Sequence, residues 1–296
     1  MCGIAGFVND MPIDVKCPVL QRMTDMIAHR GPDSEGHYID EHAALGHRRL
    51  SIIDLGGGQQ PIYNEDGSKV ITFNGEIYNY QTLREELIAA GHTFTTKSDT
   101  EVLLHGYEQW GVDLLQRVRG MFTFVIWDKN KQELFGARDH FGIKPFYYAK
   151  MNGTFMYASE IKSLLRHPDF VKELNAEALK PYMTFQYPAI GETFFKGVYK
   201  LPEGHYFTYR DGKMDIHRYY DEDFREGKQK LGELVNSIDQ TVCDSVKAHQ
   251  IADVEVGSFL SSGVDSSYVA AVARPQHTYS IGFGKGTVSY THLRAH

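Results

Sequence analysis

The sequence predicts two domains of different class: a layered α+β domain with two packed sheets, followed by the start of an α/β domain. The chain has 296 residues and 42% hydrophobic content, enough for two domains. Up to about Lys213, short apolar runs alternate with glycine and Asn/Asp turns, which indicates strands. After Tyr220 a helical apolar period replaces them, which indicates a change of architecture.

Nine runs are predicted as strands: Cys2–Val8, Ala44–His47, Ser51–Leu55, Lys69–Asn74, Phe122–Asp128, Glu133–Arg138, Phe146–Lys150, Thr154–Ala158 and His205–Tyr209. Two helices are predicted between them, Tyr80–Ala90 and Thr100–Trp110. Their apolar residues fall on one face each, with Leu83, Leu87 and Ile88 on the first and Val102, Leu103 and Tyr107 on the second. So many strands with few helices favour two sheets packed together.

The second domain is predicted at residues 231–296, after a connector at 214–230 whose run 221–230 is polar. It opens with an amphipathic helix from Leu231 to about Val246. A strand Val254–Leu260, a loop, a helix Ser266–Ala273 and a strand Thr278–Phe283 follow, which is the start of a parallel sheet. One such unit does not bury a core of its own. We therefore expect a truncated domain, with an atypical tail from about residue 287.

Composition argues against several classes of protein. The net charge is −7 and the basic residues are scattered, which argues against a nucleic-acid partner. The cysteines Cys2, Cys17 and Cys243 form no disulfide pattern, no leader is evident, and no apolar run reaches the ~20 residues that span a bilayer. The fourteen histidines follow no zinc-ligand spacing. We expect a cytoplasmic protein with no membrane contact and no structural zinc.

Cys2 is the first candidate for chemistry. If Met1 is removed, one residue carries both a thiol and an α-amine, which titrate near pH ~8.5 and ~8. The amine can then take the proton of the thiol without a histidine. The competing interpretation, which is far commoner for a Met-Cys start, is a small apolar residue that begins a buried strand.

Three other segments supply complementary groups. Asn74 and Gly75 offer a side-chain amide and an accessible backbone N–H, the donors of an oxyanion hole, although an Asn-Gly turn is the simpler explanation. Arg49 at a strand edge can bind a carboxylate in bidentate fashion, although a surface arginine is the default. Asp99 precedes a helix, where it can cap the helix or hold an ammonium group. Together they describe a pocket for an amino acid whose side chain ends in a carbonyl.

Five motifs carry a resemblance: Met1–Ile4, Arg30–Asp33, Arg49–Ile52, Asn74–Asn79 and Arg138–Pro145. In this order they resemble the class II glutamine amidotransferase domain over residues 2–213, an N-terminal-nucleophile hydrolase with an αββα sandwich. The resemblance implies that Cys2 attacks the glutamine amide and that Asn74 and Gly75 form the oxyanion hole. It also implies that glutamine is bound by Arg49 at its carboxylate, by Glu76 and Asp99 at its amino group, and by Leu50, Ser51, Ile52 and Ile53.

The segment from Ser261 to Ser267 lies between a strand and a helix. Backbone N–H groups and serine hydroxyls at a helix N-terminus cradle anions, and Asp265 can bind Mg²⁺. It has no Walker spacing, and a Ser/Gly turn with a cap explains it equally well. The segment resembles the PP-loop of ATP pyrophosphatases, with Ser262 at a usual glycine. By that resemblance ATP is bound by Leu260, Ser261, Ser262, Gly263, Asp265, Ser266, Ser267 and Ile281, with Asp265 as the metal ligand.

The two segments in one chain resemble the family of glutamine-hydrolysing asparagine synthetases, which are ATP-dependent ligases. The resemblance implies that ATP and Mg²⁺ activate aspartate as β-aspartyl-AMP, that ammonia from glutamine attacks it, and that no organic prosthetic group is needed. It is compatible with a homodimer. Because that family continues well beyond the PP-loop, we expect this chain to act as a glutaminase only. The alternatives are amidation of another carboxylate and an inactive nucleotide-binding fragment. The PP-loop disfavours amidotransferases with a sugar-isomerase or phosphoribosyl domain.

Overall fold

The computed structural model describes residues 2–187 and 191–282. It divides into two units, Met1–Glu222 and Asp223–His296, and each is described by itself. The first unit extends beyond the boundary predicted at residue 213, because the strand β12 (Lys213–Arg218) pairs with its neighbour β11. The tail predicted from about residue 287 lies outside the described residues.

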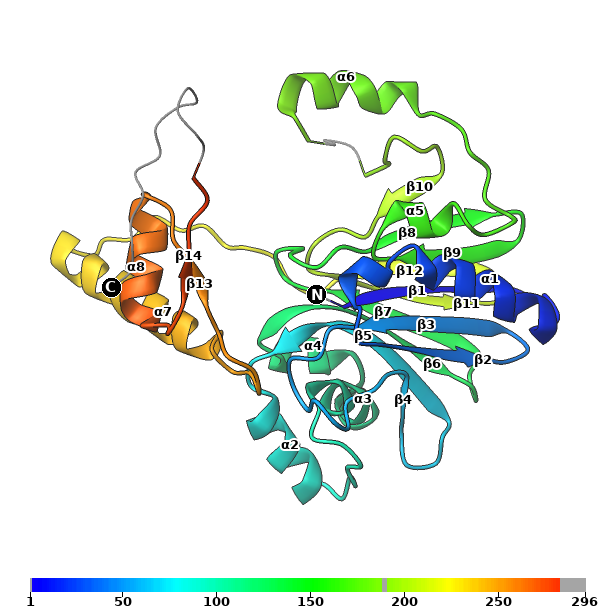
Figure 1. Ribbon diagram of the computed structural model, residues 1–296, viewed down its shortest axis with the longest axis horizontal. Helices are drawn as coiled ribbons and strands as arrows, with labels where there is room; N and C mark the ends of the chain where they lie inside the picture. Colours follow the sequence, from blue (N-terminus) through cyan, green and yellow to red (C-terminus); the bar gives the residue numbers. More distant parts are fainter. Residues whose placement is uncertain (1, 188–190, 283–296) are drawn as a thin grey trace. The chain divides into compact units, whose positions relative to one another are not determined.

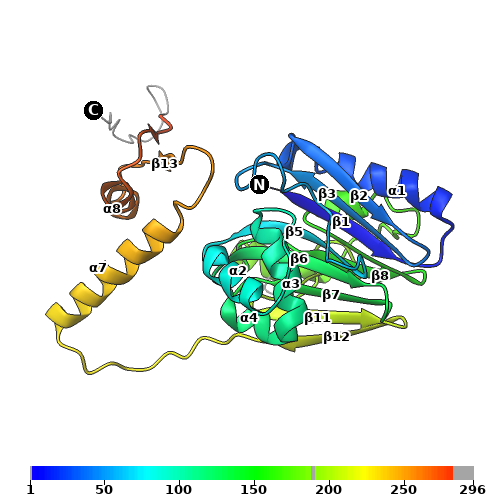
Figure 2. The ribbon, with the colours of Figure 1, turned by 90° about the horizontal axis from the view of Figure 1, so that it is seen from below.

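The first unit contains two six-stranded sheets (Figures 1 and 2). One has the strand order β10-β8-β9-β1-β3-β2 and the other β12-β11-β7-β6-β5-β4, and the pairs within both are antiparallel. The bounds in the first sheet are Val198–Lys200, Tyr147–Met151, Thr154–Ala158, Gly3–Val8, Ala43–Arg49 and Ser34–Ile39, in that order. In the second sheet β11, β7, β6, β5 and β4 are His205–Arg210, Glu133–Arg138, Gly120–Asp128, Lys69–Ile77 and Ile62–Tyr63.

Successive side chains of a strand point to opposite faces of the sheet. In β1 the side chains on both faces are buried. Ile4 points into the core between the two sheets, where it joins residues such as Trp127 and Phe207 of the second sheet. Ala5 and Phe7 point the other way and pack under a helix. The segment that carries Cys2 therefore leads into a strand held from both sides.

Helices cover the outer faces of both sheets, which gives four layers, helix–sheet–sheet–helix (Figure 2). The helix α1 (Ile13–Asp25) packs on the first sheet through Val19, Leu20 and Met23, and α5 (Ile161–Leu164) packs beside it. The helices α2 (Tyr80–Ala89) and α3 (Asp99–Trp110) lie at the second sheet. The described residues of this unit also form two 3-10 turns and two further helices: Ala28–Arg30, Gly111–Asp113, α4 (Leu114–Arg117) and α6 (Ala176–Phe185). The predicted αββα sandwich is confirmed.

Some local predictions were wrong. The segment Ser51–Leu55 is a loop and not a strand, because the Arg49 guanidinium draws its carbonyl groups inward, and Asp54 has a φ of 52°. The helix α1 was not predicted, because Pro18 lies inside it and normally interrupts a helix. Ile88, predicted on the buried face of its helix, is 51% exposed.

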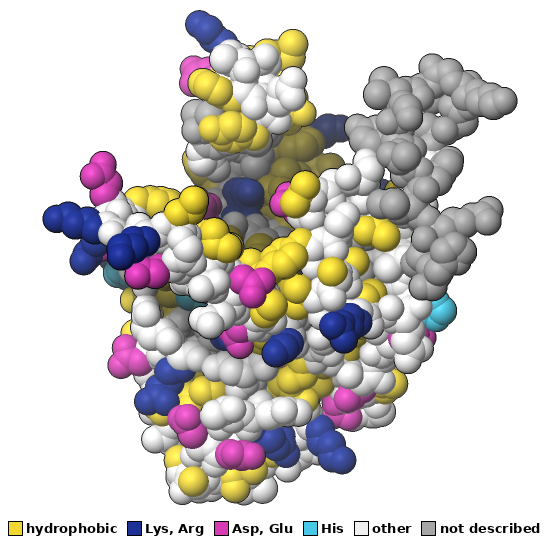
Figure 3. Space-filling view, turned by 90° about the vertical axis from the view of Figure 1, so that its left-hand side faces the viewer, with side chains coloured by type: hydrophobic (Ala, Val, Ile, Leu, Met, Phe, Trp, Pro, Cys, Tyr) yellow, Lys and Arg dark blue, Asp and Glu magenta, His cyan; other side chains and the backbone are white. Residues whose placement is uncertain are grey.

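The second unit contains α7 (Leu231–Ala248), β13 (Ser258–Phe259), α8 (Val264–Ala273) and β14 (Thr278–Tyr279). The two strands are parallel, as predicted, but shorter than predicted, and Phe283 lies outside the described residues. Apolar residues of α7 such as Leu231 and Val235 are 77% and 55% exposed. Hydrophobic side chains, coloured yellow, are visible on the face of the chain that Figure 3 shows. Over the described ranges, no helix is long and apolar enough to cross a membrane.

Candidate active site

Cys2 is fixed at the start of β1 by its neighbours. Its Sγ lies 3.4 Å from the backbone N of Leu50 and 3.5 Å from its carbonyl oxygen. Its own carbonyl accepts a hydrogen bond from Nε of Arg30 at 2.9 Å. Burial raises the pKa of the Cys2 thiol above its usual value. The resting residue is therefore a neutral thiol that needs a base.

The turn at Arg30–Asp33 packs beside Cys2 and the end of β3. A Cβ on Gly31 would lie 2.3 Å from the backbone of Arg48, so only glycine permits this approach. The Asp33 carboxylate accepts a hydrogen bond from the backbone N–H of Ser51 at 2.8 Å. This motif therefore positions the loop that follows Arg49.

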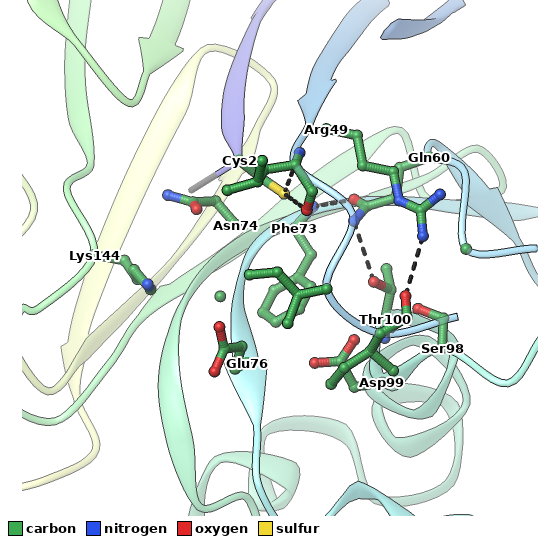
Figure 4. A pocket seen from close by; sticks show the side chains of 15 residues that line it. Cys2, Arg49, Gln60, Phe73, Asn74, Glu76, Ser98, Asp99, Thr100 and Lys144 are labelled. Atoms are coloured by element: carbon green, nitrogen blue, oxygen red, sulfur yellow. Dashed lines mark hydrogen bonds between the residues drawn. The ribbon is translucent and has the colours of Figure 1, made fainter. Parts of the chain in front are cut away.

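Asn74 lies beside Cys2 on the neighbouring sheet, in β5 (Figure 4). Its side chain is 1% exposed, and both its amide nitrogen and its amide oxygen lack a hydrogen-bond partner among the described residues. A buried amide without a partner is costly unless a ligand satisfies it. The simple turn that was the alternative for Asn74 is wrong, because the residue is inside a nine-residue strand.

The backbone N–H of Gly75 points to the same pocket. In a strand the N–H groups of alternate residues point to one edge. The N–H of Phe73 donates to Oε1 of Gln60 at 2.6 Å, and the N–H of Ile77 donates to Oδ2 of Asp99 at 3.0 Å. Gly75 lies between them, so its N–H faces the edge at which Gln60 and Asp99 line the pocket.

Gly75 also has no room for a side chain. An added Cβ would lie 2.2 Å from the carbonyl oxygen of Met121 on β6. Together with the side-chain amide of Asn74, the strand therefore presents two neutral donors close to Cys2. That is the composition of an oxyanion hole.

Gln60 and His47 are two residues that the sequence analysis did not identify. Gln60 bonds to the N–H of Phe73 and, through Nε2, to Oγ1 of Thr100 at 3.2 Å. Nε2 of His47 lies 3.0 Å from the carbonyl oxygen of Phe73, and burial lowers the pKa of His47 to about 3. A neutral His47 therefore donates to the residue before Asn74 and ties β3 of one sheet to β5 of the other.

Arg49 is 5% exposed, so the alternative of a surface arginine is wrong. Its guanidinium donates to the carbonyl oxygens of Ile53 at 3.1 Å and Asp54 at 2.6 Å. The loop carbonyls thus hold the cation at the wall of the pocket. Leu50, Ile52 and Ile53 also line the pocket, whereas Ser51 does not.

Glu76 and Asp99 lie across the pocket from Cys2 (Figure 4). Asp99 is the first residue of α3, and the cap is Ser98, whose hydroxyl accepts from the N–H of Thr100. The cap interpretation of Asp99 is therefore wrong. Burial, together with the charge of Glu76, raises the pKa of Asp99 to about 7. A carboxyl that is costly to ionise gains most from a bound cation.

Lys144 adds a charge that the sequence analysis did not assign to the site. It is 4% exposed and lines the pocket. Burial lowers the pKa of Lys144, and the charge of Glu76 opposes that shift. The pocket has an empty volume of about 480 Å³, open solvent at its mouth included. Its walls carry both signs of charge, as recognition of a free amino acid requires.

In the second unit the predicted ATP loop lies between β13 and α8. Oγ of Ser266 lies 2.8 Å from Oγ of Ser261, and the Ser267 hydroxyl donates to the carbonyl of Gly263 at 2.8 Å. Gly263 caps α8 without a side-chain bond, so the first N–H groups of the helix suit an anion. Leu260 and Ser262 lie in this loop, Asp265 lies in the first turn of α8, and Ile281 follows β14, the strand that pairs with β13.

Comparisons with known proteins agree with this geometry. The family model for the glutamine amidotransferase domain matches residues 1–220. The chain belongs to this family. A second model, for asparagine synthase, matches residues 237–292. That match extends past the start of the predicted tail.

Individual relatives are longer than this chain. It is 45% identical over 291 residues to asparagine synthetase [glutamine-hydrolyzing] 1 of Bacillus subtilis, covering 96% of this amidotransferase chain and 46% of the relative. Asparagine synthetase [glutamine-hydrolyzing] 2 of that organism is 40% identical, with 95% and 40% covered. The amidase chry2 of Gibberella zeae is 35% identical, with 92% and 42% covered. The chain thus spans less than half the length of these relatives.

Among solved structures, the chain resembles glutamine phosphoribosylpyrophosphate amidotransferase from B. subtilis. The TM-score is 0.56 at 17% identity, and 92% of this chain and 64% of that chain are covered. At this identity the likeness shows the fold, and it agrees with the αββα architecture.

Proposed function

We propose that the first unit hydrolyses glutamine to glutamate and ammonia with Cys2 as the nucleophile. The observation that carries the proposal is the buried amide of Asn74 beside the Cys2 thiol, which has no hydrogen-bond partner in the part of the chain that the structure describes. A donor kept free of protein partners suits an oxygen atom that becomes negative only during the reaction.

The chemistry follows from the groups in the pocket. Removal of Met1 gives Cys2 a free α-amine, which takes the proton of the thiol. The sulfur attacks the carbon of the side-chain amide, and the oxygen becomes an anion that Asn74 and the Gly75 N–H stabilise. The tetrahedral adduct collapses as the C–N bond breaks and the amine returns its proton to the nitrogen, so ammonia leaves. Water then cleaves the thioester and releases glutamate.

Substrate recognition uses the two charges of a free amino acid. Arg49 faces the α-carboxylate, and Asp99 with Glu76 faces the α-ammonium. The positions of these side chains on opposite parts of one pocket support this assignment. The loop residues Leu50, Ile52 and Ile53 add apolar contact, and the role of Ser51 is through its backbone bond to Asp33.

We also propose glutamine-dependent asparagine synthesis as the activity of the whole protein. The support is the second family match and the names of two B. subtilis relatives. In this proposal the serine-rich loop binds the phosphates of ATP, Asp265 binds the accompanying Mg²⁺, and aspartate is the acceptor of ammonia. The cytoplasmic location and the homodimer stay predictions.

The decisive test measures ammonia release from glutamine by the purified chain. We expect the wild-type chain to be active, Cys2→Ala to be inactive, and mass spectrometry to show loss of Met1. Cys17→Ala is the matched control, because Cys17 is an exposed free cysteine. Full activity in Cys2→Ala would reject the mechanism.

A further inference from the structure

We propose that the first unit has a second site, a tetrahedral site for a zinc-type divalent ion, made by Glu65, His92, His105 and Glu108. One ligand atom from each of these residues lies within 4.8 Å of all the others. The sequence analysis argued against structural zinc because no short ligand motif is present. The fold instead collects the four residues from the turn before β5, the loop before α3, and α3 itself.

The distances between donors suit a tetrahedral ion. Nδ1 of His92 lies 3.2 Å from Oε1 of Glu65, and Nδ1 of His105 lies 3.4 Å from Oε2 of Glu65 and 3.1 Å from Oε2 of Glu108. Bonds of roughly 2.0–2.1 Å to nitrogen and oxygen place tetrahedral ligands roughly 3.3 Å apart. These three distances are close to that spacing, and with one ligand atom per residue every pair lies within 4.8 Å, so zinc would draw the more distant side chains closer. Two imidazoles favour zinc over Mg²⁺ or Ca²⁺, which take oxygen ligands.

The opposite nitrogen of His92 supplies an independent observation. Nε2 of His92 lies 3.3 Å from Oε1 of Gln109, within hydrogen-bond distance, whereas Nε2 of His105 lies 3.6 Å from Oε1 of Glu101 and makes no hydrogen bond with the described residues. A histidine that binds a metal usually donates its other N–H to such an oxygen, which fixes the tautomer and orients the ring. Both rings are arranged so that Nδ1 is the donor that faces the cluster.

Glu108 is oriented in the same way. Its Oε1 accepts hydrogen bonds from Asn64 at 2.6 Å and Lys69 at 3.4 Å, which leaves Oε2 toward His105. The carboxylates of Glu65 and Glu108 lie 3.4 Å and 3.1 Å from Nδ1 of His105. Their negative charge favours a cation at this point.

The proposed ion would be structural, because all four ligands come from the protein. It would fasten the turn before β5 and the loop before α3 to α3, the helix whose first residue, Asp99, lines the active pocket. The site does not depend on the proposed glutaminase, since none of its four ligands lines that pocket.

The test is a zinc titration of the full chain after treatment with a chelator, with a chromophoric competitor as the readout. It is run on Cys2→Ala as well as the wild type, because the Cys2 thiol can bind zinc. We expect one ion per chain in both and a higher thermal midpoint with zinc. We expect loss of this binding in His92→Ala, and affinity roughly 10–100-fold weaker in Gln109→Leu.

His217→Ala is the control, because His217 is exposed on β12. His92 and Glu65 lie in loops, so His92→Ala and Glu65→Gln avoid the buried His105, whose loss would disturb folding. Cobalt in place of zinc should give the intense visible absorption of a tetrahedral centre. A chain that takes up no zinc, or one for which His92→Ala and His217→Ala bind equally, would overturn the proposal. Loss of glutaminase activity would leave these readouts unchanged.

Discussion

The side chain of Asn74 offers the cleanest test at the scale of one residue. Because its amide makes no hydrogen bond with the described residues, Asn74→Ala removes no such bond. We predict that turnover with glutamine falls roughly 10²–10³-fold, the usual effect of an oxyanion donor. The Michaelis constant and the thermal midpoint should change little. A variant with unchanged turnover would exclude Asn74 from the oxyanion hole.

Asp99 links binding to pH. Its pKa, raised to about 7 in the folded protein, means that the carboxylate that would bind the ammonium forms fully only above that pH. We therefore predict that the Michaelis constant for glutamine rises as the pH falls from about 8 to about 6. In Asp99→Asn the constant should be high and independent of pH over this range.

The contribution of Asp99 to the stability of the folded protein should change with pH in the opposite direction to its contribution to glutamine binding. A carboxyl whose pKa is raised by folding binds more protons in the folded state, so its contribution to stability falls as pH rises from about 4 to about 7. Asp99→Asn should therefore be more stable than the wild type at pH 8, by roughly 1–4 kcal/mol, and close to it at pH 4. Chemical denaturation measures both. Asp113→Asn, exposed beyond the other end of α3, is the control, and an Asp99→Asn effect equal at both pH values would contradict the assignment.

Some residues of the active pocket can be identified from the sequence, and others cannot. Cys2, Asn74 and Asp99 were selected from their side-chain chemistry and Glu76 from the family resemblance, and the structure gathers all four around one pocket. Gln60 and His47 carry no such signal, because their importance lies in bonds to the distant Phe73. Those bonds exist only once two sheets have packed together.

At the scale of elements, β5 depends on side chains from outside its sheet. Beyond the short β4, which pairs with Val70 and Ile71, the backbone groups of Phe73 and Ile77 on its free edge bond to Gln60, His47 and Asp99. We predict that Gln60→Leu lowers the free energy of unfolding by about 1–3 kcal/mol, since the Phe73 N–H loses its partner. Turnover should also fall, because Asn74 follows directly.

The neighbouring Gln59→Leu is the matched control, because Gln59 is exposed. It should leave both quantities unchanged. If Gln60→Leu is as active and as stable as Gln59→Leu, the edge of β5 does not need this bond. Urea titrations and initial rates measured on the same preparations give the comparison.

Elements were predicted well where the apolar period is regular and poorly where polar contacts bend the chain. The helices α2 and α3 agree with the sequence to within one residue. The predicted strand at Ser51–Leu55 failed because the Arg49 guanidinium collects the carbonyls of that segment. A buried cation that shapes a loop leaves no periodic signal.

At the scale of the whole molecule, the two units should separate functionally. Residues 223–230 are exposed and have no helix or strand, so limited proteolysis should cut there first. We predict that the resulting fragment, which ends near residue 222, keeps the glutaminase turnover of the full chain within about two-fold, since the pocket belongs to the first unit. A fragment that is folded but inactive would show that the active pocket needs the second unit.

Up to residue 282, the second unit presents two parallel strands and two helices with exposed apolar faces. We predict that the 296-residue chain, given glutamine, aspartate, ATP and Mg²⁺, releases ammonia without making asparagine. Chromatographic detection of asparagine, AMP and pyrophosphate decides the matter. Their appearance would show that this unit is catalytically competent as it stands.

The separation of Cys2 and Asn74 onto different sheets has a consequence for refolding kinetics. Each sheet can form its own hydrogen bonds, but the nucleophile meets its oxyanion donors only after the two layers have docked around Ile4 and Trp127. Far-ultraviolet circular dichroism would register the sheets, whereas regained enzymatic rate would register the docking. The delay between the two signals would time the formation of the core.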